Sequence, residues 1–329
     1  MPGRYFRLGA FAGVLVRCLG TGNAGVRRRV AGWETVFQGF VAAVVSVSLR
    51  RHGESFRPGA NAGHRCNVPA APRFAFTPQP GHAKLPGMSA PVRLGMLTPS
   101  SNTTLEPVTT AMLAGLPSVS VHFSRFRVTE IALTGDALAQ FDDRPILAAA
   151  ELLAHAKVDV IAWNGTSSGW LGFDADIRLC ERIESATGIR ASTSMLALNE
   201  ILAATGVKRF GLVTPYVDAV QQRIVANYAT LGITCDAERH LGIQDNFAFA
   251  RVSADTLTEM IRAVAADKPD AIGIICTNLQ AAPLVSALEA ELGIPIYDTI
   301  ATAVWKSLRL AGVDPVRVTG WGRIFGVVV

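Results

Sequence analysis

This sequence predicts an α/β protein of two similar lobes, each with a parallel sheet, and a ligand site in the cleft between the lobes. Short apolar runs alternate with helix-like stretches from about residue 92 onward, which is the pattern of a parallel sheet covered by helices. The second half of this pattern repeats the first. Polar turns close the apolar runs, and in open parallel sheets such turns lie where ligands bind.

Residues 1–87 differ in composition from the rest of the 329-residue chain and are expected to lie outside the fold. They hold 11 Arg and 1 Lys against 2 Glu, a formal charge of +10, whereas the remainder carries −5 and the whole chain +5. The basic balance therefore gives no reason to expect nucleic-acid binding. The longest apolar run of this leader, 37–49, is shorter than the roughly 20 residues of a membrane-spanning helix. We interpret 1–87 as a disordered or non-native leader upstream of a start at Met88, in preference to a transit peptide, which an Arg-rich composition also fits.

Residues 88–207 are predicted to form the N-terminal lobe. Apolar runs there are followed by turns and then by amphipathic stretches, which indicates strands that alternate with helices. The expected elements are, in order, a strand over 92–99, a turn over 99–102 that leads into a helix, a strand over 119–128, a helix over 144–157, a strand over 158–167, and a strand that leads into a helix over 189–206.

Residues 208–329 are predicted to form the C-terminal lobe, because the same elements recur there in the same order. The offsets between matched elements fall from 116 to 111 to 106 residues. We interpret this as a pseudo-twofold duplication of a Rossmann-like (flavodoxin-like) lobe, whose last helix is free to pack back on the first lobe. The matched elements are a strand and helix over 208–232, a strand over 233–243, a helix over 253–268, a strand over 269–278, and a strand with the closing helix over 294–312.

Polar turns at the carboxyl ends of the strands are expected to surround one cleft. Backbone N–H groups and hydroxyls in such turns suit a carboxylate, or the enediolate that forms when charge moves onto it. They do not suit a nucleotide, since no Gly-x-Gly-x-x-Gly follows a strand and no Walker-type lysine loop occurs. The alternative is that Ser, Thr and Asn serve there only as helix caps. The turns lie at 99–102, 165–167, 216 and 276–278.

Three cysteines lie in the two predicted lobes, Cys180, Cys235 and Cys276, without a CxxC pair or His-rich surroundings. This argues against a zinc site and a disulfide scaffold, and it fits a reducing, cytoplasmic setting. When the two copies of the repeat are aligned, Cys276 falls opposite Gly165. Its place between a strand and a helix N-terminus predicts a lowered pKa and a proton carrier, with a buried structural thiol as the alternative. Cys180 on a helix and Cys235 in a strand are interpreted as packing residues.

Six short motifs lie between Val92 and Phe325: TPSSNT, GTSSGW, TPYVDAV, LGIQDN with a following ARV, IICTN and GWGRIF. Together they resemble the aspartate/glutamate racemase superfamily, and within it the branch of the arylmalonate decarboxylases and maleate cis-trans isomerases. The resemblance covers nearly all of the two lobes and none of residues 1–87. It predicts an enzyme, and it implies neither a metal nor an organic cofactor.

The cysteine pattern distinguishes the activities within that branch. By the resemblance, members with one cysteine in each lobe transfer protons at both faces of a substrate carbon, and in the maleate isomerases the first-lobe cysteine attacks the double bond. In the arylmalonate decarboxylases the first position is glycine, as Gly165 is here, and the second-lobe cysteine, here Cys276, protonates one face. This implies a cofactor-independent decarboxylase of a substituted malonate-type acid. Thr166, Ser167 and Tyr216, with backbone N–H groups near the cysteine, would hold the enediolate while the leaving carboxylate lies in an apolar pocket.

Other residues depart from the decarboxylase pattern and point to a smaller or more polar acid than an arylmalonate. Asn102 and Asn246 resemble the asparagines that hold a substrate carboxylate in the isomerases. Thr277 and Asn278 stand where the decarboxylases have glycines, so they add bulk beside the thiol.

Two alternatives to the decarboxylase stay open. One is a maleate cis-trans isomerase or an Asp/Glu-type racemase that works with Cys276 and another first-lobe group. The other is a non-catalytic carboxylate-binding protein. In each case the expected partner is a small carboxylate or dicarboxylate, with no nucleic acid and no membrane, and a homo-oligomer is left open. The expected substrate-binding residues are Pro99, Ser100, Asn102, Gly165, Asn246, Thr277 and Asn278.

Overall fold

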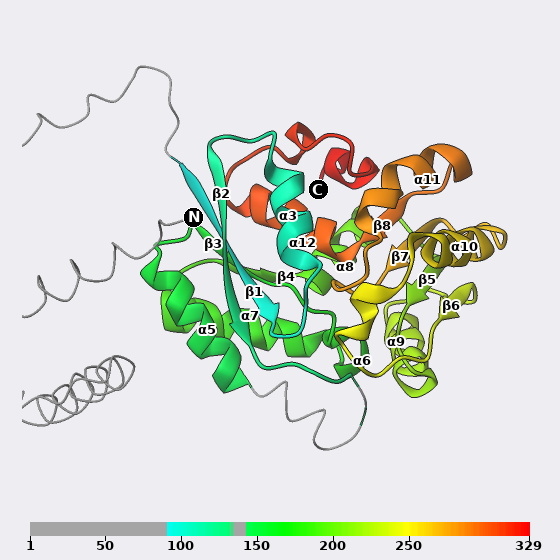
Figure 1. Cartoon of the computed structure of the whole chain (residues 1–329), viewed down its shortest axis with the longest axis horizontal. Coiled ribbons are helices and arrows are strands. Elements are labelled where there is room, and N and C mark those ends of the chain that lie inside the picture. The colour runs from blue at the N-terminus through cyan, green and yellow to red at the C-terminus, as the bar shows by residue number, and fades with distance from the viewer. Residues whose placement is uncertain (1–90, 132, 134–142) are drawn as a thin grey trace, which may run out of the picture. The chain divides into compact units, whose positions relative to one another are not determined.

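The computed structural model describes residues 91–131, 133 and 143–329 (Figure 1). The leader predicted over 1–87 and the start at Met88 lie outside the described residues. Within the described residues, none of the helices has the length and apolar character that crossing a membrane requires.

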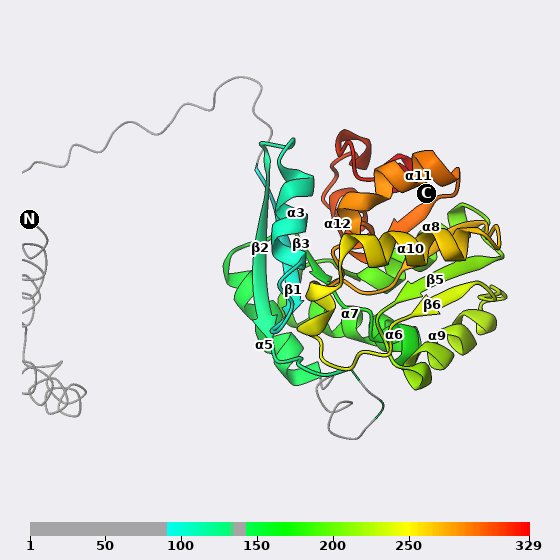
Figure 2. The ribbon, with the colours of Figure 1, turned by 45° about the vertical axis from the view of Figure 1, so that its right-hand side comes forward.

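The strands of the described residues form two four-stranded parallel sheets of the same topology (Figure 1, Figure 2). The strand order is β2-β1-β3-β4 in the first sheet and β6-β5-β7-β8 in the second, so each strand of one sheet has a counterpart in the other. The prediction of two Rossmann-like lobes with parallel sheets is confirmed. The strands are β1 (Val92–Pro99), β2 (Val119–Phe126), β3 (Val160–Trp163), β4 (Ala191–Thr193), β5 (Phe210–Thr214), β6 (Glu238–His240), β7 (Ala271–Ile274) and β8 (Ile296–Asp298).

Helices connect the strands and pack against both sheets. Helices α5 and α7 contact each other and strands of the first sheet, and α10 contacts β5, β6 and β7 of the second. Helix α12, the last in the chain, contacts α3, α8, β3 and β4 as well as its own neighbour β8, so it lies between the two sheets (Figure 2). The α-helices are α3 (Leu105–Leu113), α5 (Asp143–His155), α6 (Ser168–Leu171), α7 (Asp174–Thr187), α8 (Ser194–Ala204), α9 (Asp218–Thr230), α10 (Ala254–Ala265), α11 (Val285–Leu292) and α12 (Thr299–Leu310).

Asp159 and Asp270, the aspartates at the start of the two repeated apolar runs, make equivalent hydrogen bonds in the two lobes. The carboxylate of Asp159 accepts a hydrogen bond from the main-chain N–H of Arg93 at 2.7 Å. The carboxylate of Asp270 accepts from the N–H groups of Lys208 and Arg209, both at 2.8 Å, and these bonds lower the pKa of Asp270 below its ordinary value. In each lobe a carboxylate therefore ties the start of one central strand to the start of its neighbour.

Strand β6 is shorter than the strand predicted over 233–243, so that prediction is wrong in extent. Arg209 pairs with Thr234 in an isolated bridge, whereas Leu212 pairs with residue 238 at the start of β6. One side of this ladder thus advances four residues while the other advances three, and the extra residue interrupts the pairing as a β-bulge does. Cys235, predicted to lie in a strand, falls in this interruption and is buried.

The central strands β3 and β7 are buried along their whole length, as expected for parallel strands covered on both faces. Because all strands of a sheet run in one direction, their carboxyl ends lie at one edge. The polar turns predicted from the sequence follow these ends in both lobes. The two edges together therefore frame the candidate site.

Candidate active site

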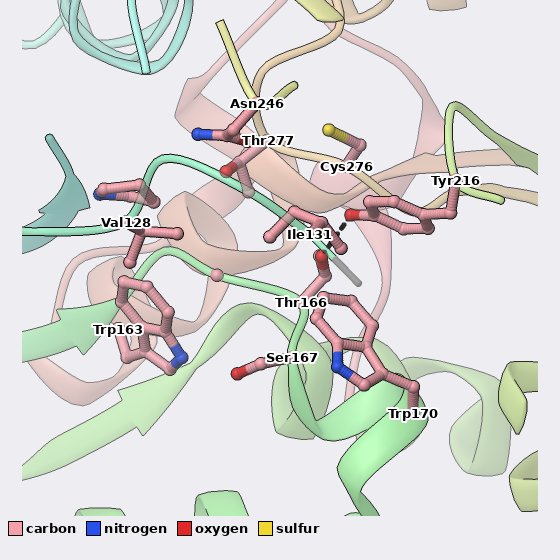
Figure 3. A pocket seen from close by; sticks show the side chains of 12 residues that line it. Val128, Ile131, Trp163, Thr166, Ser167, Trp170, Tyr216, Asn246, Cys276 and Thr277 are labelled. Atoms are coloured by element: carbon pink, nitrogen blue, oxygen red, sulfur yellow. Dashed lines mark hydrogen bonds between the residues drawn. The ribbon is translucent and has the colours of Figure 1, made fainter. Parts of the chain in front are cut away.

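A small cavity lies at the carboxyl ends of strands from both sheets (Figure 3). The first lobe contributes residues at or after the ends of β1, β2 and β3, and the second contributes residues after β5, β6 and β7. The cavity volume is about 20 Å³, which is room for on the order of one water molecule. The lining residues are Pro99, Val128, Ile131, Trp163, Gly165, Thr166, Ser167, Trp170, Tyr216, Asn246, Cys276 and Thr277.

The structure brings most of the predicted site residues together at this cavity. The predicted catalytic residues all line it, and so do four of the predicted substrate-binding residues, Pro99, Gly165, Asn246 and Thr277. Ser100, Asn102 and Asn278 are not among the lining residues.

Cys276 follows β7 and holds its thiol at the cavity. The side chain is buried, and its sulfur accepts a hydrogen bond from the main-chain N–H of Asn278 at 3.4 Å. Burial raises the pKa of the thiol from 9.0 to about 12, because loss of water penalises the thiolate more than hydrogen bonds from Asn278, Tyr216 and Leu279 favour it. The lowered pKa predicted from the sequence is therefore wrong. The chain after Cys276 makes a turn that leads into the short 3-10 helix η2 (Ala282–Leu284), so Cys276 stands six residues before the next helical residue and not at a helix N-terminus.

A hydrogen bond between two hydroxyls joins the lobes beside the thiol. The phenol oxygen of Tyr216, after β5, lies 2.7 Å from Oγ1 of Thr166, after β3. Burial raises the pKa of Tyr216 well above its ordinary value, and the neighbouring Cys276 adds to the effect. The ring is held edge-on by Trp170 and Phe249, with centroids 5.2 and 5.6 Å away. Tyr216 is thus a fixed, neutral hydroxyl that can donate a hydrogen bond into the cavity.

Ser167 stands at the N-cap position of α6, yet its side chain makes no capping hydrogen bond. The hydroxyl of Thr166 likewise faces Tyr216 rather than a helix N–H group. Capping alone therefore does not account for these two hydroxyls, and both face the cavity in Figure 3.

Asn102 and Asn278 fasten the two lobes together outside the cavity. The side-chain N–H₂ of Asn102 donates to the main-chain oxygen and the hydroxyl of Thr277, at 3.0 and 3.1 Å. The side-chain oxygen of Asn278 accepts from the N–H groups of Thr103 and Thr104, at 3.0 and 3.3 Å. Since the side-chain oxygen of Asn102 also accepts from Thr104 at 3.0 Å, its amide is fully used within the protein. These contacts position the turn that carries the thiol.

Asn246 lines the cavity and is supported from the first lobe. Its side-chain N–H₂ donates to the hydroxyl of Ser101 at 2.7 Å. The neighbouring Ser100 does not face the cavity wall: its hydroxyl donates to the main-chain oxygen of Val128 at 3.3 Å and accepts from the same residue's N–H at 3.2 Å. The segment after β1 thus contacts two residues that line the cavity, Asn246 through Ser101 and Val128 through Ser100.

Two segments that follow β2 and β6 close the cavity together. Glu130 and Asp245 form an isolated antiparallel bridge between the lobes. Side chains next to this bridge, Ile131 and Asn246, line the cavity. The flanking main-chain hydrogen bonds run from the N–H of Ile131 to the oxygen of Gln244 (3.0 Å) and from the N–H of Asn246 to the oxygen of Thr129 (3.1 Å).

Sequence reasoning missed the apolar part of the wall, formed by Val128, Ile131, Trp163 and Trp170. Val128 closes the strand predicted over 119–128 but lies two residues beyond the end of β2, and Ile131 follows in a stretch without helix or strand period. The pattern therefore gives no signal that either side chain lines a cavity. Trp163 lies within the strand predicted over 158–167 and stands two residues before Gly165. On an extended chain, residues two apart point to the same side, which is a signal that could have found it.

The duplicated α/β lobes with a thiol and hydroxyls between them belong to the architecture of the aspartate/glutamate racemase superfamily. Residues 94–325 match the family model for arylmalonate decarboxylase, and the chain belongs to that family, which it shares with the maleate isomerases. The resemblance predicted from the sequence motifs is confirmed.

Relatives with two different activities match the chain. It is 34% identical to arylmalonate decarboxylase from Bordetella bronchiseptica over 170 aligned residues. These residues make up 50% of this chain and 70% of the relative. It is 28% identical to maleate isomerase from Nocardia farcinica over 242 aligned residues. These residues make up 70% of this chain and 94% of the relative. Among solved structures, a cysteine-to-serine mutant of the Nocardia farcinica maleate cis-trans isomerase with a covalently bound succinylcysteine intermediate matches with a TM-score of 0.66 at 25% identity, over 71% of this chain and 98% of that chain.

Proposed function

We propose that this protein is a cofactor-independent decarboxylase of a substituted malonate-type acid, in which Cys276 gives a proton to one face of an enediolate. The observation that carries the proposal is the state and placement of this thiol. It is buried at the cavity, its pKa is raised to about 12, and the equivalent place in the first lobe holds Gly165. A thiol that stays protonated at neutral pH is suited to donate a proton. A single donor reaches one face of a planar carbon, so one enantiomer is expected.

The cavity offers the two carboxylates of a malonate different surroundings. The hydroxyls of Thr166, Ser167 and Tyr216 supply hydrogen bonds for the carboxylate that stays, and these bonds strengthen as negative charge builds on it. The apolar side chains of Val128 and Ile131 line the other part of the wall. A carboxylate there is poorly solvated, which favours its release as neutral carbon dioxide.

The reaction balances without an added reactant other than water. The bond between the central carbon and the leaving carboxylate breaks, and its electron pair moves into the remaining carboxylate as carbon dioxide departs. The central carbon of this enediolate then takes the proton from the sulfur of Cys276. The resulting thiolate accepts hydrogen bonds from the N–H groups of Asn278 and Leu279 and from the Tyr216 hydroxyl until water reprotonates it.

The alternative proposal is an isomerase or racemase that acts on a small dicarboxylate. Asn246 favours it, because a side-chain amide at the cavity suits a second carboxylate that stays polar throughout the reaction. In the Nocardia farcinica isomerase structure the succinyl group is bound to a cysteine. Such an addition uses a thiolate, which the raised pKa of Cys276 disfavours. A non-catalytic carboxylate-binding protein is the further alternative.

Turnover by the purified full-length protein in heavy water tests the proposal. The substrates are malonates with small and with aryl substituents, and maleate. We expect carbon dioxide release with one deuterium placed on one face of the product, and a loss of kcat on the order of 10³-fold in Cys276→Ser, because an alcohol is a far weaker acid than a thiol. Cys180→Ser is the matched control, since Cys180 lies on α7 and outside the cavity lining.

Three other results would contradict the decarboxylase. Conversion of maleate to fumarate without gas would support the isomerase. Exchange of the α-hydrogen of a chiral acid at both faces would support the racemase. Binding of malonates without any turnover would support the carboxylate-binding protein.

A further inference from the structure

In the first lobe, the indole of Trp163 occupies the space that a side chain at position 165 would need. A Cβ atom on Gly165 would lie 1.9, 2.3 and 2.5 Å from Cζ2, Cε2 and Cη2 of that indole. Non-bonded carbon atoms rest at about 3.5 to 4.0 Å, so no side chain fits at 165 while the indole stays in place. The φ angle of Gly165 is not in the left-handed region, so the need for glycine comes from this contact and not from the backbone.

The indole has little freedom to move aside. Trp163 is 1% exposed, and its ring packs against Phe126 with centroids 4.9 Å apart. It is the last residue of β3, which is paired on both sides, with β1 and with β4. In so dense an interior, an added group forces neighbouring side chains out of their preferred positions and destabilises the fold.

The second lobe has the opposite arrangement at the equivalent strand end. Ile274 ends β7 where Trp163 ends β3, and Cys276 follows two residues later where Gly165 follows in the first lobe. Both Ile274 and Cys276 are buried. The first lobe therefore has the large Trp163 two residues before a glycine, whereas the second lobe has the smaller Ile274 two residues before a cysteine.

We propose that Trp163 is a specificity-determining residue that closes the cavity on the side opposite Cys276 and thereby confines proton delivery to one face of the substrate. Figure 3 shows the indole and the thiol on opposite sides of the lining. The substrate substituent next to this wall packs on the flat indole, so Trp163 also limits its size. The stereochemical part of this inference rests on the decarboxylase proposed above, whereas the contact between positions 163 and 165 does not.

The contact is tested first, by thermal unfolding of four full-length proteins: wild type, Gly165→Ala, Trp163→Leu and the double variant. We expect Gly165→Ala to lower the melting temperature by about 5 °C in the wild type, and by about 1 °C or less when Trp163 is Leu, because the clashing ring is gone. Equal shifts in the two backgrounds would overturn the inference. The matched control is Gly169→Ala, whose Cβ would meet Met195 at 3.4 Å instead, so its shift should be the same in both backgrounds.

A milder substitution protects this test against a variant that does not fold. Trp163→Phe keeps an aromatic ring but removes the part of the indole closest to position 165. It should relieve the cost of Gly165→Ala in part. An unchanged cost in both Trp163→Phe and Trp163→Leu would show that the indole is not what excludes a side chain at 165.

The stereochemical part is tested by hydrogen exchange of the product in heavy water. Gly165→Cys alone should leave the product a single enantiomer, whereas Trp163→Leu with Gly165→Cys should exchange its α-hydrogen and racemise it at least about 10-fold faster, since one thiolate removes the proton and the other thiol returns one. Trp163→Leu alone should raise kcat/KM for a phenyl-substituted over a methyl-substituted malonate about 10-fold. Equal racemisation by Gly165→Cys with and without Trp163 would overturn the inference. If the wild type releases no carbon dioxide from any malonate, the proposed function fails, and the unfolding comparison alone decides the role of Trp163.

Discussion

The two lobes have the same strand order but different chemistry at the ends of equivalent strands. In the first lobe Trp163 ends β3, Gly165 follows two residues later against its indole, and Thr166 adds a hydroxyl. In the second lobe Ile274 ends β7, and Cys276 follows two residues later and presents a thiol. The two lobes thus share the strand order of their sheets and the carboxylate contact between central strands, and they differ in the side chains at a few positions beyond the strand ends.

The largest expected difference concerns the caps of the helices that follow β4 and β8. Thr193 caps α8 with a hydroxyl, whereas Asp298 caps α12 with a carboxylate that accepts from the N–H of Ile300 at 2.8 Å. Burial raises the pKa of Asp298 from 3.8 to about 7. A carboxyl whose pKa rises on folding stabilises the fold while it is protonated, so this stability is complete below about pH 4 and is lost as the pH rises through 7.

Asp298→Asn should remove this pH dependence, because the amide keeps the accepting oxygen and cannot ionise. Between pH 4 and pH 8, the free energy of unfolding of the wild type should fall relative to the variant by about 4 kcal/mol, from a pKa difference of about three units. Urea unfolding at the two pH values measures it. Asp314→Asn, an exposed cap of the 3-10 helix η3 (Pro315–Arg317), is the control and should show no comparable difference. Parallel pH curves for wild type and Asp298→Asn would refute the prediction.

The hydroxyl bridge between the lobes gives the next effect. Tyr216→Phe removes the group that contacts Thr166 and the thiol, so it should lower kcat/KM for decarboxylation about 10²-fold, or about 2.7 kcal/mol, as loss of one oxyanion donor does. Steady-state kinetics on the best malonate measures it. Tyr228→Phe is the matched control, because Tyr228 is equally buried, lies outside the cavity lining, and has no hydrogen-bond partner for its hydroxyl among the described residues. A similar loss in both variants would mean that Tyr216 acts through packing alone.

The smallest effect distinguishes two ion pairs at equivalent strand ends. Arg125 at the end of β2 pairs with Glu106 of α3 at 2.8 Å, and His240 at the end of β6 pairs with Asp218 of α9 at 2.8 Å. Partial burial lowers the pKa of His240, but hydrogen bonds to Glu238 and Asp218 outweigh this and raise it above 6.5. The stability from a histidine with a raised pKa is complete below pH 6.5 and is lost as the pH rises through the folded value.

Melting curves at pH 6 and pH 8 compare these pairs. The difference in melting temperature between wild type and His240→Gln should shrink at pH 8, by the equivalent of about 1 kcal/mol or less for a surface ion pair. The difference between wild type and Arg125→Gln should stay constant, since arginine does not titrate in this range. A constant difference for His240→Gln would show that its charge does not support the fold.

The sequence predicted those parts of the fold and site in which a repeated pattern of strands is followed by polar turns. The parallel sheets and the turns with Thr166, Tyr216 and Cys276 were predicted because apolar runs, each followed by a polar turn, recur in the same order in both halves of the sequence. The wall residues Val128 and Ile131 could not be predicted, since their contacts come from tertiary structure and not from a period. The pKa of Cys276 was predicted in the wrong direction, because position in a chain does not reveal burial, and burial dominates here.

The bridge between Glu130 and Asp245 has a consequence for symmetry. Each of these residues lies five positions beyond equivalent ion-pair residues, Arg125 and His240, and each segment donates one main-chain hydrogen bond and accepts one. This is the geometry of an isologous interface, as in a homodimer, but within a single polypeptide. In a homodimer of half-length chains the two strand ends would be identical, with a thiol on both sides or on neither. Joining the halves in one chain allows equivalent positions on the two sides of a pseudo-two-fold axis to differ, as Gly165 and Cys276 do.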